Sequence, residues 1–249
     1  MSKKSKILII GESCKDVFNY GYCERLCPEA PVPVFNPISS TENAGMAGNV
    51  YRNVSSLGAS AVLFTNTSWE TITKTRFIDG RTNHMFMRLD SNDKEYGRSN
   101  IREKNINFKP YDGVIISDYN KGWLSEEDIE YVAEKHDNVF LDTKKVLGKW
   151  CSGVRFIKIN NYEYEKTKHA LNKGIKEKLI ITMGAGGCKY REKVFSVEQV
   201  EIRDTSGAGD TFISALTVDY LQNNDIERAI KFASKMATRV VQKRGVSTT

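Results

Sequence analysis

The segment Asp204–Phe212 holds the residues best suited to chemistry. It reads Asp-Thr-Ser-Gly-Ala-Gly-Asp-Thr-Phe, and an apolar stretch follows it through Leu221. If a helix begins here, the N–H groups of its first turn point together at one spot, where the helix dipole favours negative charge. Two glycines also let a ligand approach the backbone closely. The segment therefore predicts an anion hole formed by the backbone of Gly207, Ala208 and Gly209.

Asp210 supplies a candidate base beside this anion hole. Phosphoryl transfer needs positioning, charge stabilisation and an acceptor for the proton of the attacking hydroxyl. Asp210 lies one residue past the amide cluster and can accept that proton. The alternative is a plain glycine-rich helix start with Asp as a dipole partner, which is the more common meaning of a bare Gly-Ala-Gly-Asp. The rest of the chain has to decide between the two.

Six short apolar runs predict the strands that would position this segment. They are Lys6–Gly11, Ala61–Thr65, Gly113–Ser117, Val139–Asp142, Arg155–Ile159 and Leu179–Met183. Runs of this length, bounded by Gly, Asp, Asn or Ser, are typical of buried strands in a mainly parallel sheet. Helices are predicted between them, for example from an N-cap at Ser125 towards Lys135, and over Ile226–Gln242 after a cap at Asp225. Alternating strands and helices predict an α/β fold with ligands at the carboxyl ends of the strands.

Two stretches interrupt this alternation. Val17–Pro37 is rich in aromatics and proline, and Lys74–Asp90 alternates apolar and polar residues around Asp79-Gly80, a hairpin turn signal. Both are predicted to be extended segments outside the main sheet. We interpret them as a small β lid over its mouth.

Length and composition limit the class of protein. The chain has 249 residues, so a single domain over residues 1–249 is expected. A net charge of +6 without an arginine-rich run argues against nucleic-acid binding. The apolar run Ile7–Ile10 is too short for a signal peptide or a membrane span, so we expect a cytoplasmic protein. The three histidines show no metal-ligand spacing, and no metal site made by protein residues alone is predicted.

The order of several motifs resembles the ribokinase-like (PfkB) carbohydrate kinases. Asp204–Phe212 is similar to the C-terminal signature of that family, in which the last Asp is the catalytic base and the preceding amides form the anion hole. Thr182–Gly187 resembles the segment that borders the nucleotide, and Asn160–Glu163 resembles an Asn-x-x-Glu motif near magnesium and phosphates. The resemblance thus implies ATP and Mg²⁺. The nucleotide-binding residues that it implies are Asn160, Glu163, Thr182, Gly184, Gly187 and Ser234.

The sugar side of the site is implied by the N-terminal motifs. Gly45–Asn49 resembles the loop that lines the sugar pocket, and Asp16 falls where the family keeps an Asp that holds sugar hydroxyls. The resemblance implies a ribokinase-like three-layer α/β/α fold with a mainly parallel central sheet and a small β lid. This chain departs from the pattern at Met46, where a second Gly is usual, and at Ser234, where an Asn often lies. Its connection from Thr65 to Thr73 is also short.

A narrower resemblance is to heptose 7-phosphate kinases. It rests on Arg25–Val34 and Ser117–Gly122, with support from Thr75-Arg76 and Met87–Asp90. A sugar that already carries phosphate needs cations to hold it. The substrate-binding residues implied are Asp16, Gly45, Asn49, Arg25, Arg76, Arg88, Asp118 and Lys121. Each cation taken alone is better explained as a solvated surface charge.

Two functions remain open from the sequence. One is an active kinase that phosphorylates a hydroxyl of a sugar or sugar phosphate with Mg-ATP, and the other is a non-catalytic sensor derived from such a kinase. Retention of Asp210 favours the kinase, because a pure binder needs no base. We also predict a homodimer joined through the lid, since an uncovered lid would expose apolar residues beside edge strands. These residues are Phe18, Tyr20, Tyr22, Phe77, Met85 and Met87. The alternative is a monomer whose lid folds down onto its own active site.

Overall fold

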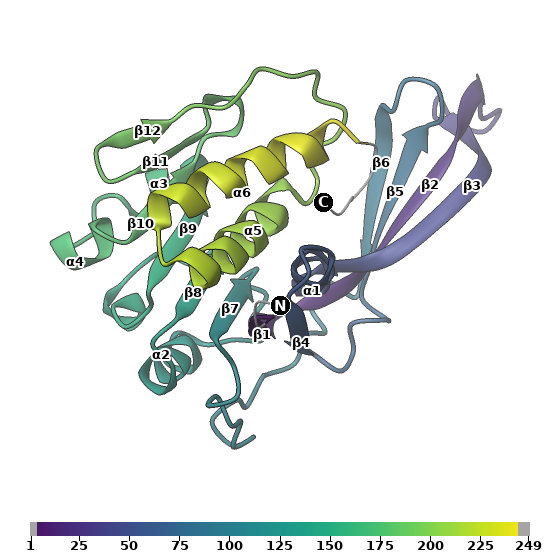
Figure 1. The fold of residues 1–249 in the computed structure, drawn as a ribbon. Coiled ribbons are helices and arrows are strands. Elements are labelled where there is room, and N and C mark those ends of the chain that lie inside the picture. The colour runs from purple at the N-terminus through teal and green to yellow at the C-terminus, as the bar shows by residue number, and fades with distance from the viewer. Residues whose placement is uncertain (1–3, 244–249) are drawn as a thin grey trace.

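An eight-stranded sheet runs through the centre of the protein (Figure 1). The computed structural model describes residues 4–243. The strand order is β12-β11-β10-β9-β8-β7-β1-β4, and the six strands from β10 to β4 are parallel. In chain order the strands are β1 Lys6–Gly11, β4 Ser60–Phe64, β7 Gly113–Asp118, β8 Val139–Thr143, β9 Phe156–Asn160, β10 Leu179–Thr182, β11 Cys188–Tyr190 and β12 Lys193–Phe195. The predicted mainly parallel sheet is confirmed, and the six predicted strands match within one residue at nearly every end.

Helices cover both faces of this sheet. One layer holds α1 (Ala47–Ser56), α5 (Ala208–Asn223) and α6 (Ile226–Val241); the other holds α2 (Glu126–Lys135), α3 (Asn161–Thr167), α4 (Lys173–Lys176) and the 3₁₀ turn η1 (Lys149–Cys151). Alternate residues of each strand belong to opposite cores: Ile7 and Ile9 cluster with α1 and α5, whereas Leu8 and Ile10 cluster with α2. Burial of both faces explains why the parallel strands read as unbroken apolar runs. The three-layer fold is confirmed.

The two helix caps predicted from the sequence are confirmed. Ser125 and Asp128 form a reciprocal capping box at the start of α2, where the Ser125 hydroxyl accepts from the Asp128 N–H at 3.1 Å. Asp225 accepts from the Arg228 N–H at 3.0 Å at the start of α6. Both caps depend only on residues within one turn, which is why they can be found without tertiary information.

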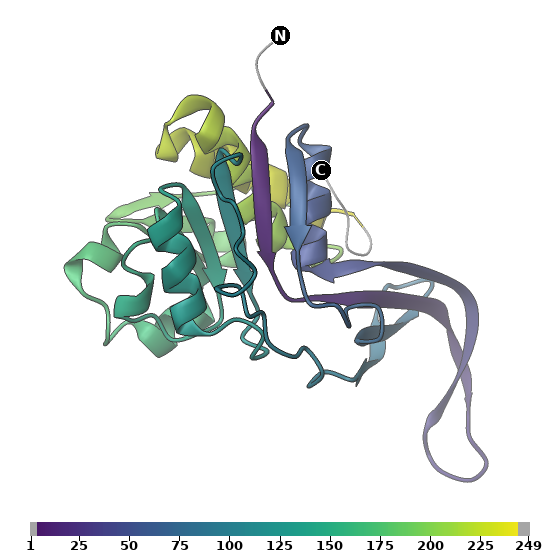
Figure 2. The ribbon, with the colours of Figure 1, turned by 90° about the horizontal axis from the view of Figure 1, so that it is seen from below.

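A second sheet of four strands stands beside the main sheet. Its order is β3-β2-β5-β6, with β2 at Ser13–Leu26, β3 at Pro33–Met46, β5 at Thr73–Asp79 and β6 at Met85–Ser91. Figure 2 shows the β2–β3 hairpin projecting far from the main sheet. The second sheet was predicted, but β3 runs on to Met46 rather than stopping near Pro37. Pairing with β2 over its whole length satisfies the backbone there, although the polar run Ser39–Glu42 has little strand propensity of its own.

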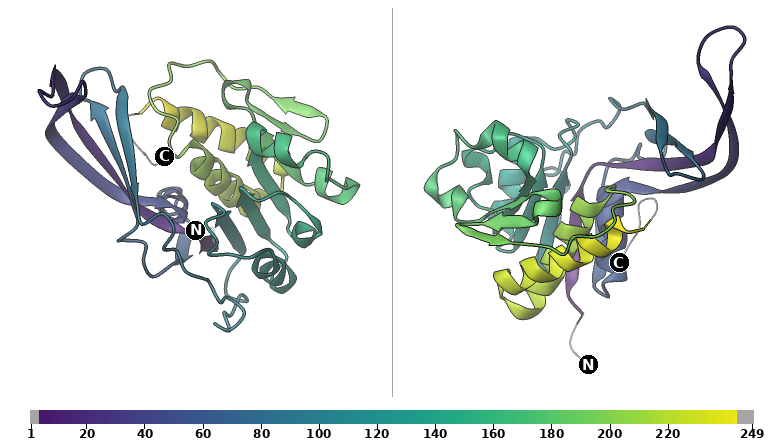
Figure 3. Two further views of the ribbon diagram at one scale, coloured as in Figure 1. Left: turned by 180° about the vertical axis from the view of Figure 1, so that it is seen from behind. Right: turned by 90° about the horizontal axis from the view of Figure 1, so that it is seen from above.

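The second sheet has two chemically different faces. Asp16, Lys74 and Asp90 are register partners across β2, β5 and β6, and Arg76 lies opposite Arg88. These five residues therefore share one side, which we call the charged face. The alternate positions carry Phe77, Met87 and Leu89 on the opposite side, which we call the apolar face. Figure 3 shows the sheet from behind and from above, with β2 and β3 leading back to β1 and α1.

Candidate active site

Asp210 lies in the first turn of α5, at the meeting point of three elements. Gly207 is the N-cap of the helix and has φ of 81°, a left-handed conformation that glycine adopts without steric cost. Asn49 on α1 donates its Nδ2 to Asp210 Oδ2 at 2.8 Å. The hydroxyl of Tyr119, just after β7, donates to Asp210 Oδ1 at 2.7 Å. The carboxylate is buried, with 5% of the residue exposed, and both of its oxygens are held.

The surroundings of Asp210 tune its proton affinity. Burial raises the pKa of this carboxyl to about 6, against the lowering effect of the hydrogen bonds from Asn49 and Tyr119. The nearby Asp142 raises the pKa further and Lys158 lowers it. A base with a pKa near neutrality is largely ionised at neutral pH and still accepts a proton readily.

Lys158 places a buried cation against the start of α5. A Cβ added to Gly209 would lie 2.8 Å from Lys158 Nζ, so the ammonium fits because residue 209 has no side chain. Lys158 extends from β9 and pairs with Asp142 of β8 at 2.8 Å. Burial alone would lower the pKa of Lys158, but the charge and hydrogen bond of Asp142 outweigh it and raise the pKa, so the side chain stays charged. This cation adds to the helix dipole and favours an anion at the helix start.

The predicted anion hole lies at the start of a helix, as expected, but one of its three N–H groups is already hydrogen-bonded. Gly207, Ala208 and Gly209 form the N-terminal turn of α5. The N–H of Ala208, however, donates to the Thr205 carbonyl at 3.3 Å within the same turn. An incoming anion would have to compete with this long hydrogen bond for that N–H.

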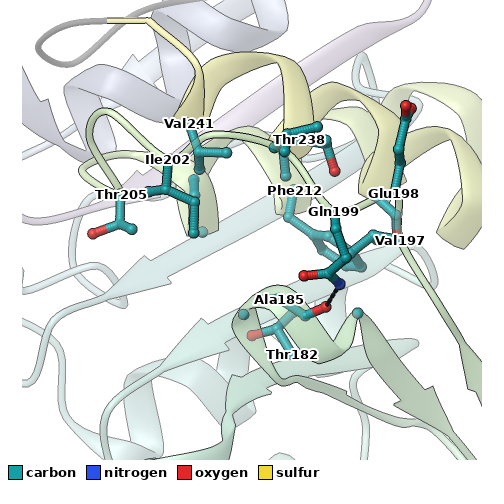
Figure 4. A pocket seen from close by; sticks show the side chains of 17 residues that line it. Thr182, Ala185, Val197, Glu198, Gln199, Ile202, Thr205, Phe212, Thr238 and Val241 are labelled. Atoms are coloured by element: carbon teal, nitrogen blue, oxygen red, sulfur yellow. Dashed lines mark hydrogen bonds between the residues drawn. The ribbon is translucent and has the colours of Figure 1, made fainter.

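A cavity beside the start of α5 is bounded by the end of β10, the turn η2 (Gly184–Gly186), the segment 197–205 and α6 (Figure 4). Four residues predicted to bind nucleotide line it: Thr182, Gly184, Gly187 and Ser234. Its walls are otherwise mainly apolar, as is typical of sites for flat organic ligands. These wall residues, for which no nucleotide contact was predicted, include Val197, Ile202, Ala237 and Val241.

Asn160 and Glu163 do not line this cavity. They form the capping box of α3: Asn160 Oδ1 accepts from the Glu163 N–H at 2.9 Å, and Glu163 Oε2 accepts from the Asn160 N–H at 2.7 Å. The motif thus has a local structural role at the end of β9. Its predicted contact with magnesium and phosphates stays a prediction.

On the other side of Asp210, Asp16 and Gly45 lie together where the two sheets join. Arg76 pairs with Asp16 at 2.6 Å, and both side chains are largely buried. A Cβ on Gly45 would lie 2.2 Å from Asp16 Oδ2, so only glycine leaves room for the carboxylate. The next residue, Met46, has φ of 58° and a buried side chain whose sulfur accepts from Lys74 Nζ at 3.2 Å. A strained conformation of this kind at a non-glycine residue is typical of functional sites.

Three of the predicted substrate cations lie in a network with carboxylates. Besides the Arg76–Asp16 pair, Arg88 forms two 2.6 Å hydrogen bonds to Asp90, and Lys121 pairs with Asp93. Arg25 is different: it lies nine residues from Asp16 along β2, or about 30 Å at the usual rise per residue. Within one chain Arg25 therefore does not join the other three cations.

Asp118 is buried and does not line the cavity beside α5. Its carboxylate accepts from Lys145 Nζ at 2.7 Å and from the Thr143 hydroxyl, which ties the ends of β7 and β8 together. Its predicted contact with substrate stays a prediction, and the observed contacts are structural. Glu12, also buried, accepts the N–H groups of Tyr119 at 2.9 Å and of Lys121 at 3.1 Å. Burial, with the charge of Asp118, raises the pKa of Glu12.

Comparison with known proteins identifies the family of this chain. The family described as pfkB family carbohydrate kinase matches residues 124–249, about half of the chain. The chain belongs to this family.

Curated relatives of similar sequence include the bifunctional protein HldE of Helicobacter acinonychis (31% identical) and that of Helicobacter pylori strain J99 (32% identical), each covering 96% of this chain. The chain spans 63% of the length of these two relatives. The alignments extend over 294 positions, more than the 249 residues of this chain, so the relatives hold residues that it lacks.

Solved structures of similar fold include two members of the ribokinase group. The nucleoside kinase of Methanocaldococcus jannaschii has a TM-score of 0.69 at 18% identity, and the Arabidopsis thaliana ribokinase complexed with ribose and ATP has 0.67 at 14%. Each alignment covers 98% of this chain and 94% of the other. The predicted ribokinase-like fold is confirmed.

Proposed function

We propose that the protein transfers the γ-phosphoryl group of ATP to a hydroxyl of a sugar or sugar phosphate. The observation that carries the proposal is the buried Asp210, with a pKa of about 6, at the start of α5 and beside the cation of Lys158. The acceptor oxygen attacks the γ-phosphorus, a new O–P bond forms, and the bond to the bridging β–γ oxygen breaks to release ADP. The proton of the acceptor hydroxyl passes to the Asp210 carboxylate.

We assign the nucleotide to the cavity between η2, the segment 197–205 and α6. Its apolar walls suit the base, and its inner end at Ala208 and Gly209 suits the phosphates. Among residues 4–243 no cluster of three or more His, Cys, Asp or Glu side chains could hold a metal. Mg²⁺ needs only one or two carboxylates besides substrate phosphates, and Glu163 is the carboxylate that the family resemblance places beside it. Bound there, Mg²⁺ would neutralise charge that develops on the phosphates.

We assign the acceptor to the region between Asp210 and the charged face. Asp16, held by Arg76 and given room by Gly45, can accept hydrogen bonds from sugar hydroxyls. Lys74, Arg76, Arg88 and Lys121 supply cations in the same region, which favours an acceptor that already carries phosphate. Together with the resemblance of Arg25–Val34 and Ser117–Gly122, this supports a heptose 7-phosphate.

We also propose that two chains pair through the second sheet. The apolar face exposes Met87 and Leu89 at 54% and 50%, and Leu26 and Ile38 are more exposed still. An exposed apolar sheet with open edges favours association. Light scattering at micromolar concentration should give twice 28.2 kDa, and a single-chain mass that sugar and nucleotide leave unchanged would rule the dimer out. In a dimer, Arg25 at the far end of β2 could reach a neighbouring site.

A coupled ADP-release assay over a panel of acceptors tests the proposal. The panel should contain heptose 7-phosphate, ribose, fructose and adenosine, each with Mg-ATP. We expect the highest specificity constant for the heptose phosphate. A higher constant for ribose or adenosine would reject the narrower substrate but keep the kinase, whereas ATP or sugar binding with no ADP release for any acceptor would support a sensor. Use of ATP fits a cytoplasmic location, which stays a prediction.

A further inference from the structure

Tyr119 contacts Asp210 directly, although the kinase motifs assign it no role. It lies one residue past β7, and its hydroxyl donates to Asp210 Oδ1 at 2.7 Å across 91 residues of sequence. Its backbone is held as well, because its N–H donates to the buried Glu12 Oε2 at 2.9 Å. The ammonium of Lys144 lies 4.3 Å from the centre of its ring. The side chain is therefore fixed at the backbone, the ring and the hydroxyl.

The two donors on Asp210 leave room for a substrate. An ionised carboxylate offers about four lone-pair positions on its two oxygens. Asn49 occupies one position on Oδ2 and Tyr119 occupies one on Oδ1. One position on each oxygen is left for the acceptor hydroxyl. Because the donors hold different oxygens, rotation of the carboxylate would break at least one hydrogen bond, and its plane is fixed.

Tyr119 keeps its proton under working conditions. Burial, together with the negative charge of Asp210, raises the pKa of the Tyr119 hydroxyl well above its ordinary value, so it stays a donor. The other groups that act on Asp210 are the amide of Asn49 on α1 and the charges of Asp142 on β8 and Lys158 on β9. These two charges act in opposite directions, and the donors Tyr119 and Asn49 both favour the ionised carboxylate.

We propose that Tyr119 is a positioning residue for Asp210, which fixes the plane of the carboxylate and favours its ionised form for taking up the acceptor proton. The assignment rests on the proposed function, in which Asp210 is the base. Loss of a hydrogen bond to a carboxylate raises the pKa of the carboxyl by about one to two pH units. Loss of the hydroxyl should therefore move the titration of Asp210 upward by about that amount.

The pH profile of Tyr119→Phe tests this role. The variant keeps the ring and removes only the hydroxyl. The acid limb of kcat/KM should move about one to two units to higher pH, so the loss relative to wild type is about 5- to 50-fold at pH 6 and shrinks towards pH 8. Tyr131→Phe, on α2, is the matched control and should leave the profile unchanged. A Tyr119→Phe loss that is the same at every pH, or no loss, would overturn the proposal.

A second measurement does not depend on turnover. With ¹³C-carboxyl aspartate, the Asp210 signal is identified by its absence in Asp210→Asn, and its titration midpoint should be higher in Tyr119→Phe than in wild type. In wild type alone, the Tyr119 hydroxyl proton should resist exchange and shift as Asp210 is protonated near pH 6. Should no acceptor be phosphorylated, these shifts still decide the claim about Tyr119. Equal midpoints in the two proteins would reject it.

Discussion

Replacement of Asp210 by Asn should change the stability of the protein more favourably at neutral pH than at acid pH, relative to wild type. The pKa of this carboxyl is about 6 in the fold and 3.8 in the unfolded reference. Between these values the folded chain binds more protons than the unfolded one, so the free energy of unfolding falls as pH rises. The shift corresponds to about 2.4 kcal/mol lost by wild type between pH 4 and pH 7. Asn does not titrate, so the free energy of unfolding of the variant lacks this dependence on pH.

Urea unfolding of both proteins at pH 4, 5, 6 and 7 measures the effect. Asn is close in shape to Asp, and any difference in its hydrogen bonds with Asn49 and Tyr119 is constant with pH. The stability of the variant minus that of wild type should therefore grow by about 2.4 kcal/mol from pH 4 to pH 7. Asp137→Asn, at an exposed position, controls for removal of one negative charge. A difference that stays flat across this range would refute the raised pKa and the argument for a near-neutral base.

Three further substitutions test the surroundings of Asp210. Gly45→Ala should lower kcat/KM for the acceptor by about 10²-fold with ATP binding unchanged, because its Cβ displaces the Asp16 carboxylate; equal loss for both substrates in steady-state kinetics would argue against a sugar site there. Arg76→Met leaves Asp16 largely buried without its ion-pair partner and should lower the free energy of unfolding by about 3 kcal/mol in urea titrations at pH 7. Ala237→Phe fills the cavity and should weaken ATP binding at least about tenfold by calorimetry, whereas exposed Lys235→Phe on the same helix should not.

Features set by local sequence were predicted closely. The parallel strands are buried on both faces, so each apolar run in the sequence ends where the buried strand ends. The caps at Ser125 and Asp225 involve only neighbouring residues and can be recognised from them. The start of α5 was predicted for the same reason, because its glycines are neighbours in the sequence. The second half of β3 was missed because pairing with β2, and not composition, holds it extended.

The contacts that give the site its chemistry could not be predicted from local sequence. Asn49 and Tyr119 reach Asp210 across 161 and 91 residues, and no local pattern pairs them. Lys158 did leave a signal, since a charged residue inside the buried run Phe156–Ile159 requires a partner, but the partner Asp142 lies on another strand. Met46 was marked as a departure from the family, and its φ of 58° shows the strained conformation for which Gly is usual. The carboxylate partners of Arg76 and Lys121 likewise come from a neighbouring strand and a loop, whereas Arg88 pairs with Asp90 on its own strand.

The turnover of Asp210→Asn tests the central claim most directly. The variant should bind ATP as wild type does, measured by calorimetry, because the cavity walls do not include residue 210. With the best acceptor at pH 7.5, its kcat should fall by at least about 10²-fold, since the acceptor proton then has no base to receive it. Retention of most of the wild-type turnover would contradict the assignment of Asp210 as the base of a phosphoryl-transfer site.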